Sequence, residues 1–317
     1  MAGKDISTKK YMRNPIIFAD FFNGLIYGGK QEIDWAQLQE IDTSMLLKFQ
    51  AGSRKLKSLQ KFRDIIKKSV IMRNDKCFYA ILGIENQSDI HYAMPVRDML
   101  YDSLSYLRQV EEISDYNRIE GKCTGEDYIS GFTKGDKLIS VVTVTLYWGS
   151  KPWDAPTSLK QMLADVDDSL WPFINDYDIN LFSIIDREDF PAYKTELREL
   201  FLLLNSRNDK QKMQNLVATD KAFSNIKRDT AELMSEFASI QLPSRSKKGG
   251  YDMCKAVMEI KQEGFEEGRE EGEENLLDLY AWLKQNNRIE EAEAIMIKEN
   301  KDLRKKLQLE YKEKANN

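Results

Sequence analysis

Apolar residues along the chain recur at two different spacings, which predict both helices and strands. Residues 15–27 (PIIFADFFNGLIY) carry apolar side chains at helical spacing, and Gly28 with Gly29 supplies a C-cap. Residues 1–14 before them are polar and are expected to be loose. The first element predicted from the N-terminus is therefore a helix.

Two runs rich in β-branched and aromatic residues follow, at 63–72 and 77–87. They flank Asn74 and Asp75, a polar pair that is typical of a turn, and so predict an antiparallel hairpin. A helix is expected over residues 92–113.

The later part of the chain completes the predicted fold. Residues 138–149 are apolar almost throughout, as in a central strand covered on both faces, and residues 181–185 offer another strand. Residues 191–242 have helical character. A short mixed sheet flanked by helices makes the fold class α/β (α+β).

The predicted domains follow from these elements. They are a domain over 1–242 with its core at about 15–190, a linker over 243–250 and a charged helical tail over 251–317.

The composition excludes several classes of protein and of metal site. No apolar run approaches the roughly 20 residues of a membrane span, and no signal peptide is recognisable, so a cytoplasmic protein without a membrane partner is expected. Three scattered cysteines and the single His91 cannot build a disulfide framework or a zinc cluster. Any bound metal must therefore use oxygen ligands.

Charge is distributed unevenly along the chain, whose net charge is −5. Residues 48–76 hold ten basic and two acidic residues, whereas residues 256–317 hold sixteen acidic and eleven basic ones. The basic strip could neutralise the phosphates of a bound duplex. The alternative is a solvated basic loop and strand edge.

The hairpin brings candidate catalytic residues together. If Asn74 and Asp75 form its turn, Asp64 lies opposite Glu85 on one face of the sheet, and Gln87 lies on the same face. Two adjacent carboxylates repel each other unless a cation lies between them, and Mg²⁺ or Mn²⁺ would suit these oxygen ligands. Such a site could hydrolyse phosphodiesters.

An alternative reading needs no metal. Asp64 and Glu85 would then be ordinary surface carboxylates, paired with basic residues nearby in the sequence: Arg63, Lys67 or Lys68.

The segment RDIIKKSVIMRNDKCFYAILGIENQSDIHYAMPVRDMLYDSLSYL resembles the core of the PD-(D/E)XK nuclease superfamily, in the Rpn branch of recombination-promoting nucleases and putative transposases. The motif residues of that branch fall on Asp64, Glu85, Gln87, Arg97 and Tyr101. The resemblance implies a restriction-endonuclease-like core and metal-dependent DNA cleavage that serves recombination or transposition. DNA is then the expected partner, and Arg63, Lys67 and Lys68 are expected to contact its backbone or to support the site.

Two positions depart from the pattern of the resemblance. Gln87 stands where the superfamily usually has a lysine, which removes a cation from the site. The first helix usually offers an acid near its start, where this chain has Asn14 and Pro15. Asp20 is the nearest candidate for an accessory acid, although it could instead cap a helix or form an ion pair.

Arg97 and Tyr101 lie four residues apart, on one face of the predicted helix. Both could face a DNA backbone. Alternatively, Arg97 holds the helix on the sheet through an ion pair with Glu85 or Asp64, and Tyr101 packs in the core.

The tail leaves its own alternatives open. Gly264, Gly268 and Gly272 recur every four residues and could bring two helices close in a homodimer, or the tail could be a mobile acidic arm. Two rival functions remain beside the nuclease: a DNA-binding or interaction module with weakened catalysis, and a scaffold that assembles through the tail.

Overall fold

The structure, a computed structural model, divides the chain into two compact units, Met1–Cys254 and Lys255–Asn317. It describes residues 2–41, 64–73, 76–125, 127–190, 192–245, 249–297 and 300–315. Most of the basic strip, including Arg63, lies outside the described residues.

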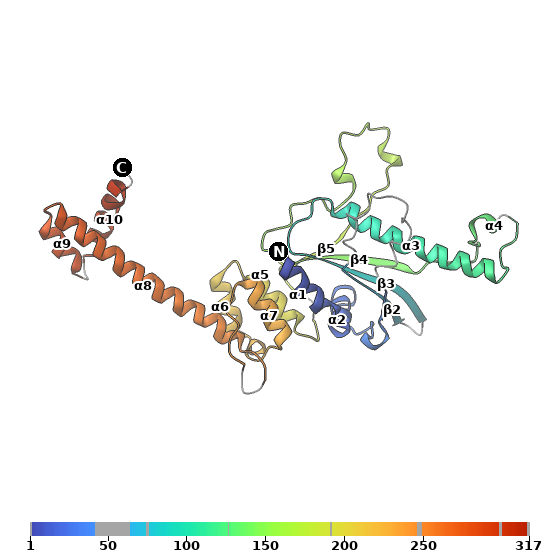
Figure 1. The fold of residues 1–317 in the computed structure, drawn as a ribbon, viewed down its shortest axis with the longest axis horizontal. Helices are drawn as coiled ribbons and strands as arrows, with labels where there is room; N and C mark the ends of the chain where they lie inside the picture. The colour runs from blue at the N-terminus through green and yellow to red at the C-terminus, as the bar shows by residue number, and fades with distance from the viewer. Residues whose placement is uncertain are drawn as a thin grey trace. The chain divides into compact units, whose positions relative to one another are not determined.

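A five-stranded mixed sheet forms the centre of the first unit, with strand order β1-β2-β3-β4-β5 (Figure 1). The strands are β1 (Gln39–Glu40), β2 (Ile65–Arg73), β3 (Lys76–Gln87), β4 (Ser140–Tyr147) and β5 (Asn180–Ser183). The first three pair antiparallel, and β3, β4 and β5 pair parallel. A mixed sheet with flanking helices confirms the predicted α/β (α+β) class.

The register of the hairpin agrees with the prediction. Arg73 pairs with Lys76 and Ile65 pairs with Ile84, so Asp64, the next residue outward, comes opposite Glu85. The turn residues themselves lie outside the described ranges. Because side chains alternate between faces along a strand, this register fixes which residues share the face of Glu85.

Helices cover both faces of the sheet (Figure 1). The helix α3 (Met94–Ile119) lies on the face of Glu85, and α1 (Ala2–Arg13) and α2 (Pro15–Tyr27) lie on the other face. As predicted, α2 ends at Gly28, which adopts a left-handed conformation with φ of 60°.

The expectation of a loose N-terminal segment is wrong. Residues 2–13 form α1, which packs against α2, β2, β3 and α7 (Arg228–Ala238). Thr8, Tyr11 and Met12 are buried there, and the Tyr11 hydroxyl is hydrogen-bonded to Thr230 on α7. The few apolar positions of α1 were too sparse to indicate a helix, but tertiary packing holds it.

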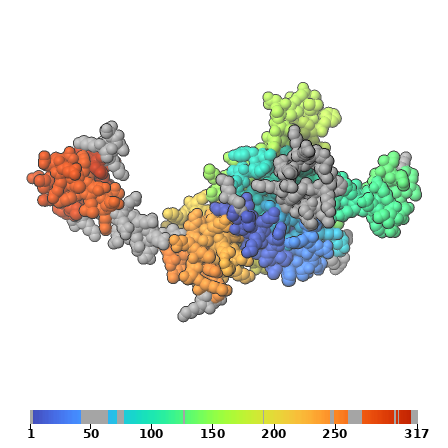
Figure 2. Space-filling view, in the orientation of Figure 1, coloured from blue at the N-terminus to red at the C-terminus, as the bar shows by residue number. Residues whose placement is uncertain are grey.

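Further helices complete the first unit. They are α4 (Asp127–Ser130), α5 (Leu197–Ser206) and α6 (Lys210–Thr219), together with the short 3₁₀ helices η1 (Trp35–Gln37), η4 (Lys160–Met162), η5 (Trp171–Phe173) and η6 (Lys221–Ser224). An aromatic core of Phe21, Phe182 and Phe201 joins α2, β5 and α5. In the space-filling view, the segment that contains η4 and η5 and the region of α4 stand out from the body of this unit (Figure 2).

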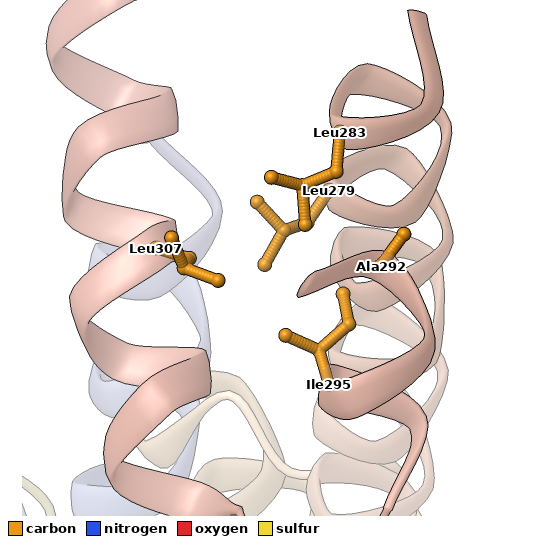
Figure 3. Close-up of a cluster of buried hydrophobic side chains, with 5 residues drawn as sticks. All are labelled: Leu279, Leu283, Ala292, Ile295 and Leu307. Carbon is orange, nitrogen blue, oxygen red and sulfur yellow. The ribbon is translucent and has the colours of Figure 1, made fainter. Parts of the chain in front are cut away.

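The second unit is helical, as predicted for the tail. It consists of α8 (Met253–Gln285), which begins just before the boundary between the units, α9 (Ile289–Met296) and α10 (Lys301–Ala315). Leu279, Leu283, Ala292, Ile295 and Leu307 form a small buried cluster between the three helices (Figure 3). Between α8 and α9, Asn287 adopts a positive φ of 58°.

None of the helices within the described ranges combines the length and the apolar character that a membrane crossing requires.

Candidate functional site

Asp64 and Glu85 hold each other in place at the adjoining ends of β2 and β3. The Asp64 backbone N–H donates to Glu85 Oε1 at 3.2 Å, and the Asn86 backbone N–H donates to Asp64 Oδ2 at 2.9 Å. Each carboxylate is thus fixed by the backbone of the strand that carries the other. The hairpin register predicted this adjacency, and the reciprocal hydrogen bonds give it a defined geometry.

Two cations balance the charge of this carboxylate pair. Arg97 Nη2 on α3 lies 2.9 Å from Glu85 Oε2, and Lys9 Nζ on α1 lies 3.4 Å from Asp64 Oδ1. The expected repulsion between the two carboxylates is relieved in this way. The described cationic partners of the pair therefore come from α1 and α3. The alternative interpretation of the sequence names Arg63, Lys67 and Lys68 instead.

The two carboxylates differ in burial. The Glu85 side chain is fully buried, whereas Asp64 retains 18% of its side-chain exposure. Among the described contacts of Glu85, the ion pair to Arg97 supplies the compensation that a buried charge requires. Asp64 is therefore the member of the pair that solvent or a ligand reaches more easily.

Arg97 and Tyr101 support the site from α3. Arg97 Nε donates to the Tyr101 hydroxyl at 3.3 Å, and the guanidinium lies over the Tyr101 ring. Burial lowers the pKa of Arg97, but the Glu85 carboxylate and Tyr101 together raise it above its ordinary value. Burial, followed by the charge of Glu85, raises the pKa of Tyr101. Arg97 thus links α3 to the sheet, and Tyr101 contacts the Arg97 guanidinium from the same helix. For both residues a contact with DNA stays a prediction.

Gln87 lies on the same face, at the carboxyl end of β3. Its backbone pairs with β4, where it is the register partner of Tyr147, and its side chain is buried to 9% exposure. Its carboxamide forms no hydrogen bond with any other residue that the structure describes. The amide therefore remains available to a water molecule or to a ligand of the carboxylate pair.

Two site residues escaped the sequence reasoning. Lys9 was missed because its segment was expected to be loose. Asp98 on α3 is buried and accepts a hydrogen bond of 2.7 Å from the hydroxyl of Thr145, which is the β4 register partner of Glu85. An acidic residue within the buried stripe of α3, between Met94 and Tyr101, was a signal that could have found Asp98.

Asp20, the candidate accessory acid, has a different role in the structure. Its buried carboxylate accepts hydrogen bonds from the backbone N–H groups of Lys194 and Thr195 and from the Thr195 hydroxyl, at 2.6–2.9 Å. These bonds anchor α2 to the segment before α5. Among the described residues, Asp20 forms no hydrogen bond with the carboxylate pair, and the N–H groups that donate to it precede α5 instead of belonging to it. Its role as an accessory acid stays a prediction.

Lys67 does not lie beside the carboxylate pair, where it was expected to contact DNA or to support the site. It alternates with Asp64 and so faces the opposite side of the sheet, where its side chain is only 2% exposed. Its ammonium donates to the Arg13 carbonyl at 2.8 Å, at the C-terminal end of α1, and lies over the Phe18 ring. Lys67 therefore neither contacts a ligand on the Glu85 face nor supports the site there.

Lys68 points to the side of α3 and lies over the Tyr79 ring, with part of its side chain exposed. Arg63 lies outside the described residues. For these two residues the contact with DNA stays a prediction.

The donor set is compatible with a hard divalent ion. The described residues contain no group of three or more His, Cys, Asp or Glu side chains that could hold a metal, so a metal site here would rest on Asp64, Glu85 and the Gln87 amide. A contact is described at each of the four carboxylate oxygens, and an ionised carboxylate offers about four lone-pair sites on its two oxygens. Mg²⁺ usually binds through one or two carboxylates and several waters.

No protein-family model, curated protein or solved structure matches the chain. The side chains themselves are therefore the basis for assigning a function.

Proposed function

We propose that the chain is a metal-dependent DNA endonuclease of the PD-(D/E)XK type, which hydrolyses phosphodiester bonds. The observation that carries the proposal is the interlocked pair of Asp64 and Glu85 on neighbouring strands, with cationic partners on both carboxylates. Two converging carboxylates supply oxygen ligands of the kind that bind a divalent ion. The motif resemblance extends the proposal to a restriction-endonuclease-like core and to DNA breakage in recombination or transposition.

Each residue has a specific task in this proposal. Asp64 and Glu85 bind Mg²⁺ or Mn²⁺, and Gln87 orients a water molecule or a phosphate oxygen through its amide. Arg97 keeps the Glu85 side chain in one orientation, because its own guanidinium is fixed by Tyr101. The bound ion would supply an activated water and stabilise charge on the phosphate.

A second function is favoured by a specific observation. Glu85 is fully buried and forms an ion pair with Arg97, and neutral Gln87 adds no cation to the site. Such an arrangement also suits a DNA-binding module in which catalysis has weakened and the carboxylates serve to hold α3 on the sheet.

Plasmid cleavage separates these functions. Supercoiled plasmid is incubated with the protein in Mg²⁺, in Mn²⁺ and in EDTA, alongside Asp64→Asn, Glu85→Gln and the control Asp115→Asn, whose side chain is 72% exposed on α3. The nuclease predicts metal-dependent nicking that both site variants reduce by more than about 100-fold and the control does not change.

The other outcomes contradict the nuclease proposal. DNA binding without nicking in any metal would identify the module. Absence of both cleavage and DNA binding would favour a scaffold that assembles through the helical second unit.

A further inference from the structure

The two cations at the carboxylate pair are held very differently. Arg97 has a short contact of 2.9 Å with Glu85, a second bond to Tyr101 and a side chain that is 20% exposed. Lys9 has a longer contact of 3.4 Å with Asp64 and a side chain that is 38% exposed. An exposed ion pair of this length contributes little free energy, so the Lys9 ammonium leaves Asp64 at small cost.

The backbone of Lys9 is nevertheless fixed beside the site. Asp5, one helical turn before Lys9 on α1, accepts a hydrogen bond of 2.8 Å from the hydroxyl of Ser88, directly after β3. Lys9 itself reaches Asp64, directly before β2. Two successive turns of α1 therefore contact the strand ends that carry Gln87 and Asp64, and the mobile part of Lys9 is its side chain alone.

Open space adjoins Lys9. The residue lines a groove of about 710 Å³ between α1 and α7, together with Lys10 and Arg13 on the α1 wall and Asp229 and Glu232 on the α7 wall. The flexible four-carbon stem of lysine can move its ammonium within such a space.

We propose that Lys9 is the phosphate-binding cation of the site, an inference that rests on the proposed nuclease function. Lys9 neutralises Asp64 in the free protein. With a divalent ion on the carboxylates, the ammonium would be repelled from Asp64 by like charge, and Lys9 would contact a non-bridging oxygen of the phosphate under attack.

A comparison of Gln87, Arg97 and Lys9 as sources of positive charge supports this role. Negative charge on the attacked phosphate increases during hydrolysis and requires a positive group nearby. Gln87 is neutral, and Arg97 is committed to the buried Glu85. Of the two described cations that contact the carboxylate pair, Lys9 has the more exposed side chain and the weaker contact. No bond forms or breaks at Lys9, whose role is electrostatic.

Three variants test the inference: Lys9→Gln, Lys9→Arg and the control Lys10→Gln, which alters the same helix and the same groove wall. Lys9→Gln should lower kcat for plasmid nicking by about 100-fold with little change in KM, because the contact strengthens in the transition state. Lys9→Arg should restore most of the rate, and Lys10→Gln should retain kcat.

Metal binding measured without DNA should change in the opposite direction from the cleavage rate. In calorimetric titration with Mn²⁺ alone, Lys9→Gln should bind the ion about two- to fivefold more tightly than the native protein, because no ammonium competes for Asp64. Slower cleavage combined with tighter metal binding is not expected from a residue that only stabilises the fold.

The possible failures are distinguishable. If the native protein cleaves and Lys9→Gln cleaves equally well, this inference is overturned and the nuclease proposal stands. If Lys9→Gln and Lys9→Arg both unfold by circular dichroism, or lose cleavage and Mn²⁺ binding together, Lys9 is a structural residue and the inference is overturned. If the native protein does not cleave, both proposals fall.

Discussion

Arg97 Nη2 lies 2.9 Å from Oε2 of the fully buried Glu85, so one ion pair both orients a candidate catalytic carboxylate and fastens α3 to the sheet. Glu85 lies on the face of the sheet that α3 covers. The Tyr101 hydroxyl accepts a hydrogen bond from the Arg97 guanidinium and lies on the next turn of α3. Local stability and the geometry of the site are therefore coupled through Arg97.

Arg97→Ala should lower the free energy of unfolding by about 3 to 5 kcal/mol, because it removes the cation that is paired with the buried Glu85 carboxylate. The double variant Glu85→Gln/Arg97→Ala should be less destabilised than the sum of the two single variants. Urea denaturation measures all three. The exposed pair Arg228–Glu232 is the control, and Arg228→Ala should cost less than about 1 kcal/mol. Additive effects at Arg97 and Glu85 would contradict the coupling.

Asp20→Ala should destabilise the protein by about 3 kcal/mol, since it removes the carboxyl acceptor of two backbone N–H groups and one hydroxyl. Cleavage per folded molecule should stay unchanged, because Asp20 anchors α2 and does not contact the carboxylate pair. Thermal unfolding and nicking assays well below Tm measure the two effects. A variant that stays folded but no longer nicks DNA would restore Asp20 as an accessory acid.

Lys67→Met should leave the salt dependence of DNA binding unchanged, because its ammonium is buried against the Arg13 carbonyl. A lysine that contacts a phosphate would instead reduce the slope of log affinity against log salt by about 0.9. Fluorescence anisotropy over a range of salt concentrations measures this slope. Lys68→Met, on the opposite face of the same strand, is the matched comparison, and a reduced slope for Lys67→Met would show that the prediction is wrong.

Leu283→Ala should destabilise the helical second unit by about 2 to 5 kcal/mol, because Leu283 is fully buried in the cluster of α8, α9 and α10. Amide hydrogen exchange should become faster in α9 and α10 and remain unchanged in the sheet of the first unit. Leu277→Ala, on the exposed side of α8, should change exchange very little. Equal effects of the two variants would argue against this cluster as the core of the unit.

The hairpin and its register could be predicted from sequence because they depend on short-range pattern. The alternation of side chains and a turn at Asn74 and Asp75 were enough to bring Asp64 opposite Glu85. The same local logic predicted α2 with its glycine cap, the central strand β4 and the helical tail.

The partners of the carboxylates could not be predicted in this way. Lys9 lies 55 residues from Asp64 in the sequence, and Asp98 lies 47 residues from Thr145. Their positions follow from how α1 and α3 pack on the sheet, which the local pattern does not encode. Burial of Lys67 likewise depends on the end of α1, in a segment that had seemed too polar to fold.

The hydrogen bonds from the Asp64 N–H to Glu85 and from the Asn86 N–H to Asp64 make the site sensitive to the length of its strands. Many substitutions within β2 or β3 preserve the alternation of side chains, but a residue inserted into or deleted from one strand would turn Asp64 or Glu85 toward α2. Homologous chains that keep this pair should therefore vary in the composition of the hairpin while conserving the number of residues that separates the two carboxylates.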